Sequence, residues 1–197
     1  MVETIAPVVY GRRRDYLIAV AFHSLAATIA ALILGLALGT VGMLVGAPWG
    51  RAGMAFVVVA GVLYAARELF GLPIPLFDRK QQVPDWWRTF YSPRVAAALY
   101  GAGLGLGFLT YLRHGTFVVV AAVALASGDP LVGALIAAPF GLARGLTALV
   151  SARSSDEVGP ARIVTRLSDL AARTQWTRIA NATACLAIAV VSLSEWV

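Results

Sequence analysis

YLIAVAFHSLAATIAALILGLALGTVGMLVG, residues 16–46, decides the fold class of this chain. The stretch holds no Asp, Glu, Lys or Arg, and it is longer than the roughly 20 residues that cross a hydrocarbon core of about 30 Å. In lipid the backbone of such a segment satisfies its hydrogen bonds as a helix. Arg12, Arg13 and Arg14 precede it, as in a signal peptide, but the apolar part of a signal peptide is only about 7–15 residues long. We therefore expect a retained transmembrane helix.

The composition of the whole chain agrees with this reading. Apolar residues (AVILMFWYC) make up 59% of the 197 positions and charged residues 13%, and the mean hydropathy is +0.79, which is far more apolar than a soluble domain. The net charge is +6, but the basic residues lie between the apolar runs and form no single basic face. We predict an integral membrane protein that has the lipid bilayer as a partner and binds no nucleic acid.

Five apolar stretches are long enough to cross a bilayer as helices. The predicted fold class is therefore all-α, a polytopic bundle of about five transmembrane helices. The first and third stretches exceed thirty residues, so each must tilt steeply, project from the bilayer or break. The joints at 47–50 and 128–130 contain Pro and Gly and are expected to face the same side. The five stretches are 16–46, 52–70, 94–127, 131–152 and 178–196.

Basic residues are concentrated in alternate joining segments, and short loops rich in Lys and Arg stay in the cytoplasm. Five spans then place the N-terminus inside and the C-terminus outside, in the inner membrane of a bacterium. Residues 1–15 become a basic cytoplasmic arm, and residues 16–197 form one transmembrane domain with cytoplasmic links at 72–93 and 153–177. The basic residues on the cytoplasmic side are Arg12, Arg13, Arg14, Arg79, Lys80, Arg88, Arg153, Arg162, Arg166 and Arg173, against Arg51 on the other side.

Two alternatives concern this topology. If His114 and Gly115 form a hairpin, the number of spans rises to six and the later segments change sides, which the arginine-rich fourth link opposes. Apolar positions within 153–177 recur near helical spacing, which predicts an amphipathic surface helix or an ordinary solvated helix.

Residues 100–117 carry a glycine at every second position over part of the third stretch. Gly101, Gly103, Gly105 and Gly107 either let a neighbouring helix approach closely, through Gly103 and Gly107 four residues apart, or loosen the backbone so that carbonyls face a cavity. A phosphate-binding glycine loop is excluded, because it requires a preceding strand. We assign these glycines to helix packing.

Polar residues inside the apolar stretches are candidates for binding a small polar or anionic solute. Arg113 and His114 lie near the middle of the third stretch and Arg144 lies inside the fourth, where an arginine is costly unless it meets an anion, a headgroup or backbone carbonyls. His23 in the first stretch is expected to hydrogen-bond across helices, with a proton relay as the alternative. With Thr110, these residues form the predicted substrate-binding set.

Several residue types argue against an enzyme. Cys185 is the single cysteine, so no disulfide or CxxC pair forms within the chain, and the spacing of His23, His114 and Cys185 does not predict a metal site. The pair Arg67 and Glu68 is most simply an interfacial ion pair, and Glu195-Trp196 is an outer-edge anchor. Since no catalytic set stands out, we predict no enzyme activity and no cofactor.

Part of the chain resembles the CcdA/DsbD membrane family. The resemblance covers residues 12–17, the glycines of the first stretch at Gly35, Gly39, Gly42 and Gly46, and residues 61–64. It implies inverted repeats and a role in cytochrome c biogenesis or thiol reduction, with the broken segment around 101–116 opening the second repeat. The redox cysteines are absent: no Pro-Cys helix precedes Arg12, and residues 110–115 read Thr-Tyr-Leu-Arg-His-Gly where the second cysteine is expected.

Three functions follow from these observations. The main prediction is a small transporter or channel that forms a homo-oligomer, because broken helices with Gly, Arg and His are typical of solute paths. The first alternative is an accessory subunit or assembly factor of a larger membrane complex, with a partner membrane subunit packed on the glycine-lined faces. The second is a degenerate thiol-redox relative that uses Cys185, which is disfavoured because a buried thiol is usually inert.

Overall fold

The computed structural model describes residues 10, 12–76, 86–107, 114–149 and 174–194. Thr110 and Arg113 of the predicted binding set lie outside the described residues, as do Glu195, Trp196 and most of the segment 153–177. Within the described part of the chain all regular secondary structure is helical, which confirms the all-α class. The helices are α2 (Arg13–Leu44), α3 (Arg51–Phe70), α4 (Trp87–Phe90), α5 (Pro93–Gly105), α6 (Thr116–Ala126), α7 (Pro130–Leu146) and α9 (Thr174–Ser194).

Among the described residues, four helices are long and apolar enough to cross a membrane. They are α2, α3, the segment Pro130–Leu149 that contains α7, and Gln175–Leu193 within α9. The third predicted stretch, 94–127, was expected to tilt, project or break, and in the structure it contains the two shorter helices α5 and α6. α5 ends at Gly105, and Gly107 adopts a left-handed φ of 68° that continues neither helix.

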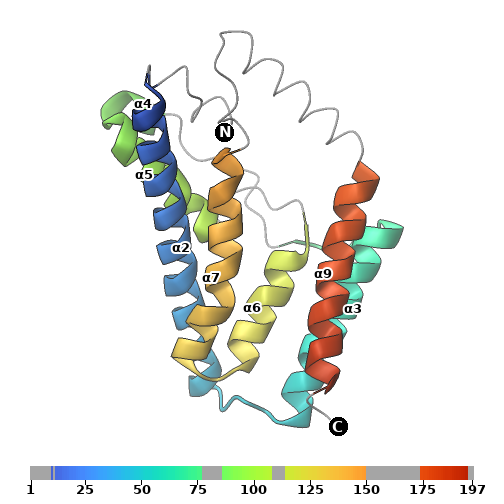
Figure 1. The fold of residues 1–197 in the computed structure, drawn as a ribbon. Helices are drawn as coiled ribbons and strands as arrows, with labels where there is room; N and C mark the ends of the chain where they lie inside the picture. Colours follow the sequence, from blue (N-terminus) through green and yellow to red (C-terminus); the bar gives the residue numbers. More distant parts are fainter. Residues whose placement is uncertain (1–9, 11, 77–85, 108–113, 150–173, 195–197) are drawn as a thin grey trace.

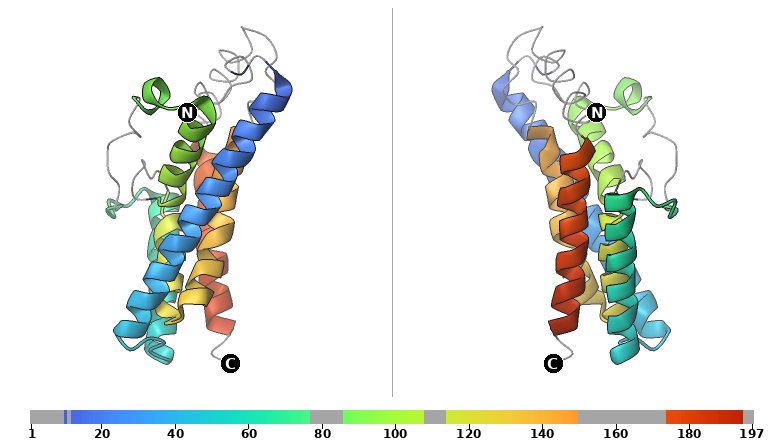
Figure 2. Two further views of the ribbon diagram at one scale, coloured as in Figure 1. Left: turned by 90° about the vertical axis from the view of Figure 1, so that its left-hand side faces the viewer. Right: turned by 90° about the vertical axis from the view of Figure 1, so that its right-hand side faces the viewer.

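The helices form two packed groups that α6 connects. α2 packs most extensively on α7 and α5, while α3 pairs with α9, and α6 contacts helices of both groups. Figure 1 shows α6 between the α2–α5–α7 group and the α3–α9 pair. In both side views of Figure 2, α2 runs obliquely over the length of the bundle. The break between α5 and α6 therefore lies where the two groups meet.

The joints 44–51 and 126–130 lie at one end of the bundle, together with the C-terminal end of α9 (Figure 1). A Cβ at Gly128 would overlap the carbonyl of Ala47, so the two joints are in direct contact. Asp129 caps α7, because its Oδ1 accepts hydrogen bonds from the backbone N–H groups of Leu131 (2.7 Å) and Val132 (3.0 Å). Pro130 follows at the first helical position.

Glycines bring α2 into backbone contact with its neighbours. A Cβ added at Gly35 would overlap the carbonyl of Gly133, and one at Gly39 would overlap the carbonyl of Asp129. Gly42 lies in the same way on the carbonyl of Leu125 at the end of α6. This is the small-residue packing by which helices associate in lipid, where no hydrophobic effect drives them together.

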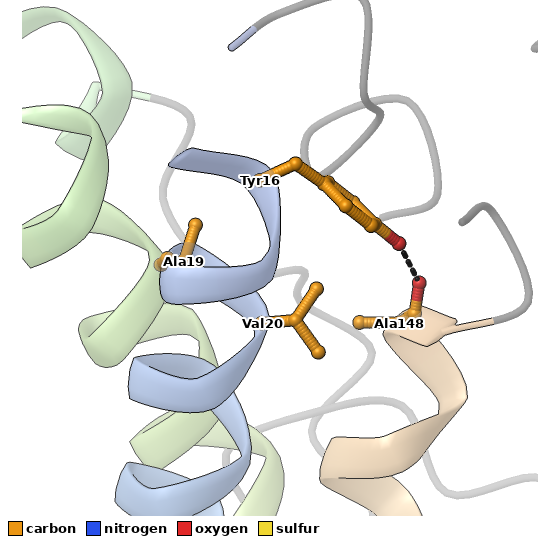
Figure 3. Packing of buried hydrophobic residues seen from close by; sticks show 5 residues of the cluster. Tyr16, Ala19, Val20 and Ala148 are labelled. Atoms are coloured by element: carbon orange, nitrogen blue, oxygen red, sulfur yellow. Dashed lines mark hydrogen bonds between the residues drawn. The ribbon is translucent and has the colours of Figure 1, made fainter. Parts of the chain in front are cut away.

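At the opposite end, a tyrosine fastens α2 to the last turn of the α7 segment. Tyr16 is fully buried among Ala19, Val20, Ala97 and Ala148. Its hydroxyl donates a hydrogen bond of 2.7 Å to the carbonyl of Ala148, as Figure 3 shows. This bond gives a side-chain partner to a carbonyl at the C-terminal end of the α7 segment.

Candidate functional site

Glu68 is the centre of the most polar buried cluster that the structure describes. It lies in the last turn of α3 and is only 2% exposed. Its Oε1 accepts hydrogen bonds from Arg67 Nη1 (2.8 Å) and from the backbone N–H of Gly115 (3.0 Å). Its Oε2 lies 3.0 Å from Nδ1 of His114. One carboxylate therefore joins the end of α3 to the start of α6.

The contact with Gly115 places negative charge at the N-terminus of α6. Gly115 is the N-cap residue of this helix, and the first N–H groups of a helix have no partner within it. A carboxylate there satisfies one donor and interacts favourably with the positive end of the helix dipole. The ring of Tyr64 packs on Gly115 so closely that a Cβ would overlap it. A glycine at 115 is thus required for the approach of α3.

α9 completes the cluster from the other side. Thr116 Oγ1 donates a hydrogen bond of 2.6 Å to Asn181 Oδ1, and the thiol of Cys185 lies 4.0 Å from the same hydroxyl. Arg178 Nε donates to the carbonyl of Glu68 (2.5 Å), and its Nη2 donates to the carbonyl of Leu69 (3.2 Å). These bonds satisfy carbonyls at the C-terminal end of α3, where a cation also complements the helix dipole.

The predicted binding residues that the structure describes belong to two clusters. His114 contacts Glu68 in the α3–α6–α9 cluster. His23 is buried on α2, and its Nδ1 lies 2.9 Å from the carbonyl of Ala97 in α5, so Nδ1 is the protonated nitrogen that donates this bond. The guanidinium of Arg144 lies over the ring of Phe140 at 5.5 Å. His114 thus belongs to the α3–α6–α9 cluster, while His23 and Arg144 lie on α2 and α7 of the other helix group.

The depth assigned to His114 from the sequence also changes. Counted along residues 94–127, it falls near the middle of a single span. In the structure it lies beside Glu68, two residues before the end of the membrane-length helix α3. The third stretch consists of two helices, and each is positioned by its own neighbours. The number of residues from the start of the stretch therefore does not give the depth of His114.

Two of the alternating glycines, Gly101 and Gly105 of α5, face α2. A Cβ at Gly101 would overlap the carbonyl of His23, and one at Gly105 would overlap the carbonyl of Ala27. The pair that meets α2 is therefore Gly101 and Gly105, while Gly107 lies beyond the helix end against the ring of Phe117. Gly103 is also buried. The sequence predicted a packing pair four residues apart, but at Gly103 and Gly107. The pair that packs on α2 lies two positions earlier in the chain.

The hydrogen bonds of the Glu68 cluster link the helices α3, α6 and α9. The carboxylate accepts three hydrogen bonds from the chain itself, and two of the donors belong to ionisable side chains. A carboxylate has about four acceptor positions, so with three of them in use Glu68 has little capacity left for a ligand. Among the described residues no group of three or more His, Cys, Asp or Glu is arranged to hold a metal ion.

Known proteins that match this chain carry the name methylamine utilization protein MauF. The protein from Paracoccus versutus is 34% identical over 139 residues, which cover 70% of this chain and 51% of the relative. The chain is similar to MauF. The MauF proteins of Methylorubrum extorquens (34% identity over 130 residues, 66% of this chain and 46% of the relative) and Paracoccus denitrificans (32% over 133 residues, 67% and 48%) match in the same way. The chain thus spans about half the length of these curated relatives.

No protein-family model matches the chain, and no solved structure matches it. The similarity to MauF corrects two predictions. The resemblance to the CcdA/DsbD family is wrong, because the matching proteins are named MauF and none is named CcdA or DsbD. The main prediction of a transporter or channel is wrong as well, since a methylamine utilization protein fits neither that class nor the thiol-redox alternative. The accessory-protein alternative is closer to the MauF name.

The central role of Glu68, and the parts played by Asn181 and Arg178, were not predicted from the sequence. Glu68 was paired with its neighbour Arg67, a contact that does exist. An acidic residue within a membrane-length helix is costly unless it has partners, and this signal was available. The partners themselves could not be identified from the sequence, because His114 is 46 residues and Arg178 is 110 residues away from Glu68.

Proposed function

We propose that this chain is a membrane-embedded accessory protein of a methylamine-utilization system, acting as an assembly factor or a subunit of a larger membrane complex and not as an enzyme. The observation that carries the proposal is the similarity to MauF proteins, at about one third identity over two thirds of the chain. Because the chain spans about half of those relatives, the activity of the whole protein is part of the proposal.

The geometry of the buried polar groups supports an accessory role. Glu68, Thr116 and Arg178 bond to other groups of the same chain and link α3, α6 and α9. Gly101 and Gly105 make close helix contacts rather than opening toward a cavity. A rigid helix bundle of this kind serves well as a docking platform for another membrane subunit.

The proposed membrane arrangement has five crossings in the bacterial inner membrane, with the N-terminus inside and the C-terminus outside. α5 and α6 together make the third crossing as a broken helix. Two observations support this count: α5 and α6 do not pack along each other, as a hairpin would require, and they follow one another along the bundle (Figure 1). The segments around 72–93 and 153–177 are then cytoplasmic links.

Deletion of the gene in its host tests the proposed function. We expect the deletion strain to lose growth on methylamine as the sole nitrogen source while growth on ammonium stays normal, and the intact gene to restore growth. A Glu68→Leu variant, which breaks the link between α3 and α6, should restore growth poorly, whereas Asp15→Asn at an exposed ion pair should restore it fully. Normal growth of the deletion strain on methylamine would overturn the proposal.

A further inference from the structure

A pocket opens where the C-terminal end of α3 meets the N-terminal end of α9. Its volume is about 450 Å³, and its walls are Glu68, Leu69, Gln175, Arg178 and Ile179. This volume lies within the roughly 300–1,000 Å³ of sites for small molecules or headgroups. None of the residues predicted to bind a solute lines it.

The pocket carries an uncompensated positive charge. Arg178 donates two of its five N–H groups to the carbonyls of Glu68 and Leu69. In the part of the chain that the structure describes, no carboxylate pairs with Arg178. The carboxylate of Glu68 does not fill this role, because it bonds to Arg67, His114 and Gly115. The remaining guanidinium donors and the amide of Gln175 are suited to an anion.

The surroundings of the pocket are apolar and face outward. Phe70 is 77% exposed and Trp176 is 71% exposed, while Leu69 and Ile179 are exposed beside them. The residues belong to the ends of two membrane-length helices, the level at which aromatic side chains meet lipid headgroups. An occupant must therefore combine an anionic group with a hydrocarbon chain.

We propose that this pocket binds the headgroup phosphate of an anionic phospholipid. Arg178 and Gln175 donate hydrogen bonds to the phosphate oxygens. The first part of an acyl chain lies along Leu69, Ile179 and the exposed ring of Phe70. Because Arg178 also holds the last carbonyls of α3, the bound lipid strengthens the attachment of α9 to α3.

Native mass spectrometry of the full chain in detergent tests this site, with phosphatidylglycerol as the probe and phosphatidylcholine as the neutral comparison. Wild-type protein should retain phosphatidylglycerol in preference to phosphatidylcholine. Arg178→Gln should weaken phosphatidylglycerol binding by about fivefold, the effect of one basic residue near a lipid surface. Arg51→Gln, at the N-terminus of α3, is the matched control and should bind as wild type does.

A second variant separates lipid binding from folding, because Arg178→Gln also removes bonds to α3. Gln175→Glu leaves those bonds intact and adds a negative charge at an exposed wall of the pocket. It should reduce phosphatidylglycerol binding while the lipid-free melting temperature stays unchanged. Equal binding by wild type and Gln175→Glu would overturn the proposal. So would displacement of the lipid by millimolar inorganic phosphate, which would mark a site for free anions.

Discussion

At Glu68, one carboxylate accepts hydrogen bonds from a guanidinium, an imidazole ring and a backbone N–H of the same chain. The neighbouring residues explain the arrangement: Gly115 admits the ring of Tyr64, and Arg67 also reaches the carbonyl of Ile74 with its Nε (2.9 Å). The carboxylate therefore fixes both the start of α6 and the chain that leaves α3. Removal of the Glu68 carboxylate should therefore loosen both the start of α6 and the C-terminal end of α3.

Replacement of Glu68 by Leu should destabilise the protein strongly. Removing one partner of a buried ion pair costs about 3–5 kcal/mol, because the remaining groups are left unpaired. Glu68→Gln keeps an acceptor oxygen and should cost less. Thermal unfolding in detergent measures both, with Asp15→Asn as the control, because the exposed pair of Asp15 with Arg94 is worth about 1 kcal/mol or less. Equal stability of Glu68→Leu and Asp15→Asn would contradict the role of Glu68.

The sequence was informative about single residues only where the partner is close along the chain. The pair Arg67 and Glu68 was predicted from adjacency and exists. The bond from Glu68 to Gly115 joins residues 47 positions apart, and no local pattern marks it. His23 was expected to bond across helices, but its acceptor, Ala97, is a backbone carbonyl that no side-chain pattern identifies.

At the scale of helices, small residues decide how closely the elements approach. Gly35 and Gly39 of α2 lie on the backbone of the α7 region, and Gly101 and Gly105 of α5 lie on the backbone of α2. The break after α5 has a local cause, since glycines weaken a helix and Gly107 takes a left-handed conformation. α2 is therefore packed between α5 and α7 without large side chains at the contacts.

Alanine substitutions at the glycines of α5 should separate close packing from simple helix propensity. Gly101→Ala and Gly105→Ala each place a Cβ against a carbonyl of α2 and should destabilise the protein by about 1–3 kcal/mol. Gly53→Ala is the matched control, because its Cβ would meet Trp49 at an ordinary 3.7 Å, so it should be neutral or slightly stabilising. Melting temperatures in one detergent measure all three. A stabilising effect at Gly101 would show that the helices are not in close contact.

The helical stretches were predictable from apolar length, and four of the five correspond to membrane-length helices. The possibility of a break in the third was also predicted, from its length and its glycines. Which glycines contact the neighbouring helix was not predicted, because Gly101 and Gly103 belong to the same run of alternating glycines and look alike in the sequence. Only the neighbouring helix decides which pair faces it.

At the scale of the whole molecule, the two helix groups meet mainly through α6. The polar bonds of the α3–α6–α9 cluster and the glycine contacts of the α2–α5–α7 group lie on different sides of this helix. This division was invisible in the sequence, since it depends on contacts between distant segments. The basic residues do predict the sides of the membrane on which the ends lie.

Reporter fusions test that orientation. A fusion of alkaline phosphatase after Ser194 should be active, because the enzyme folds only outside the cytoplasm, and a green fluorescent protein at the N-terminus should fluoresce. Reversing the arginines of the first arm to Glu should lower the fraction of molecules in this orientation. An inactive C-terminal phosphatase would indicate an even number of crossings and would favour the hairpin at His114 and Gly115.

The bond between Tyr16 and the carbonyl of Ala148 joins residues 132 positions apart, and this distance constrains biosynthesis. When α2 leaves the ribosome, the helix that will cover its glycines has not yet been translated. In the proposed membrane arrangement, the glycine face of α2 therefore stays uncovered until α5 and α7 have been synthesised. The packing of α2 is therefore not completed by pairing helices in the order of their synthesis.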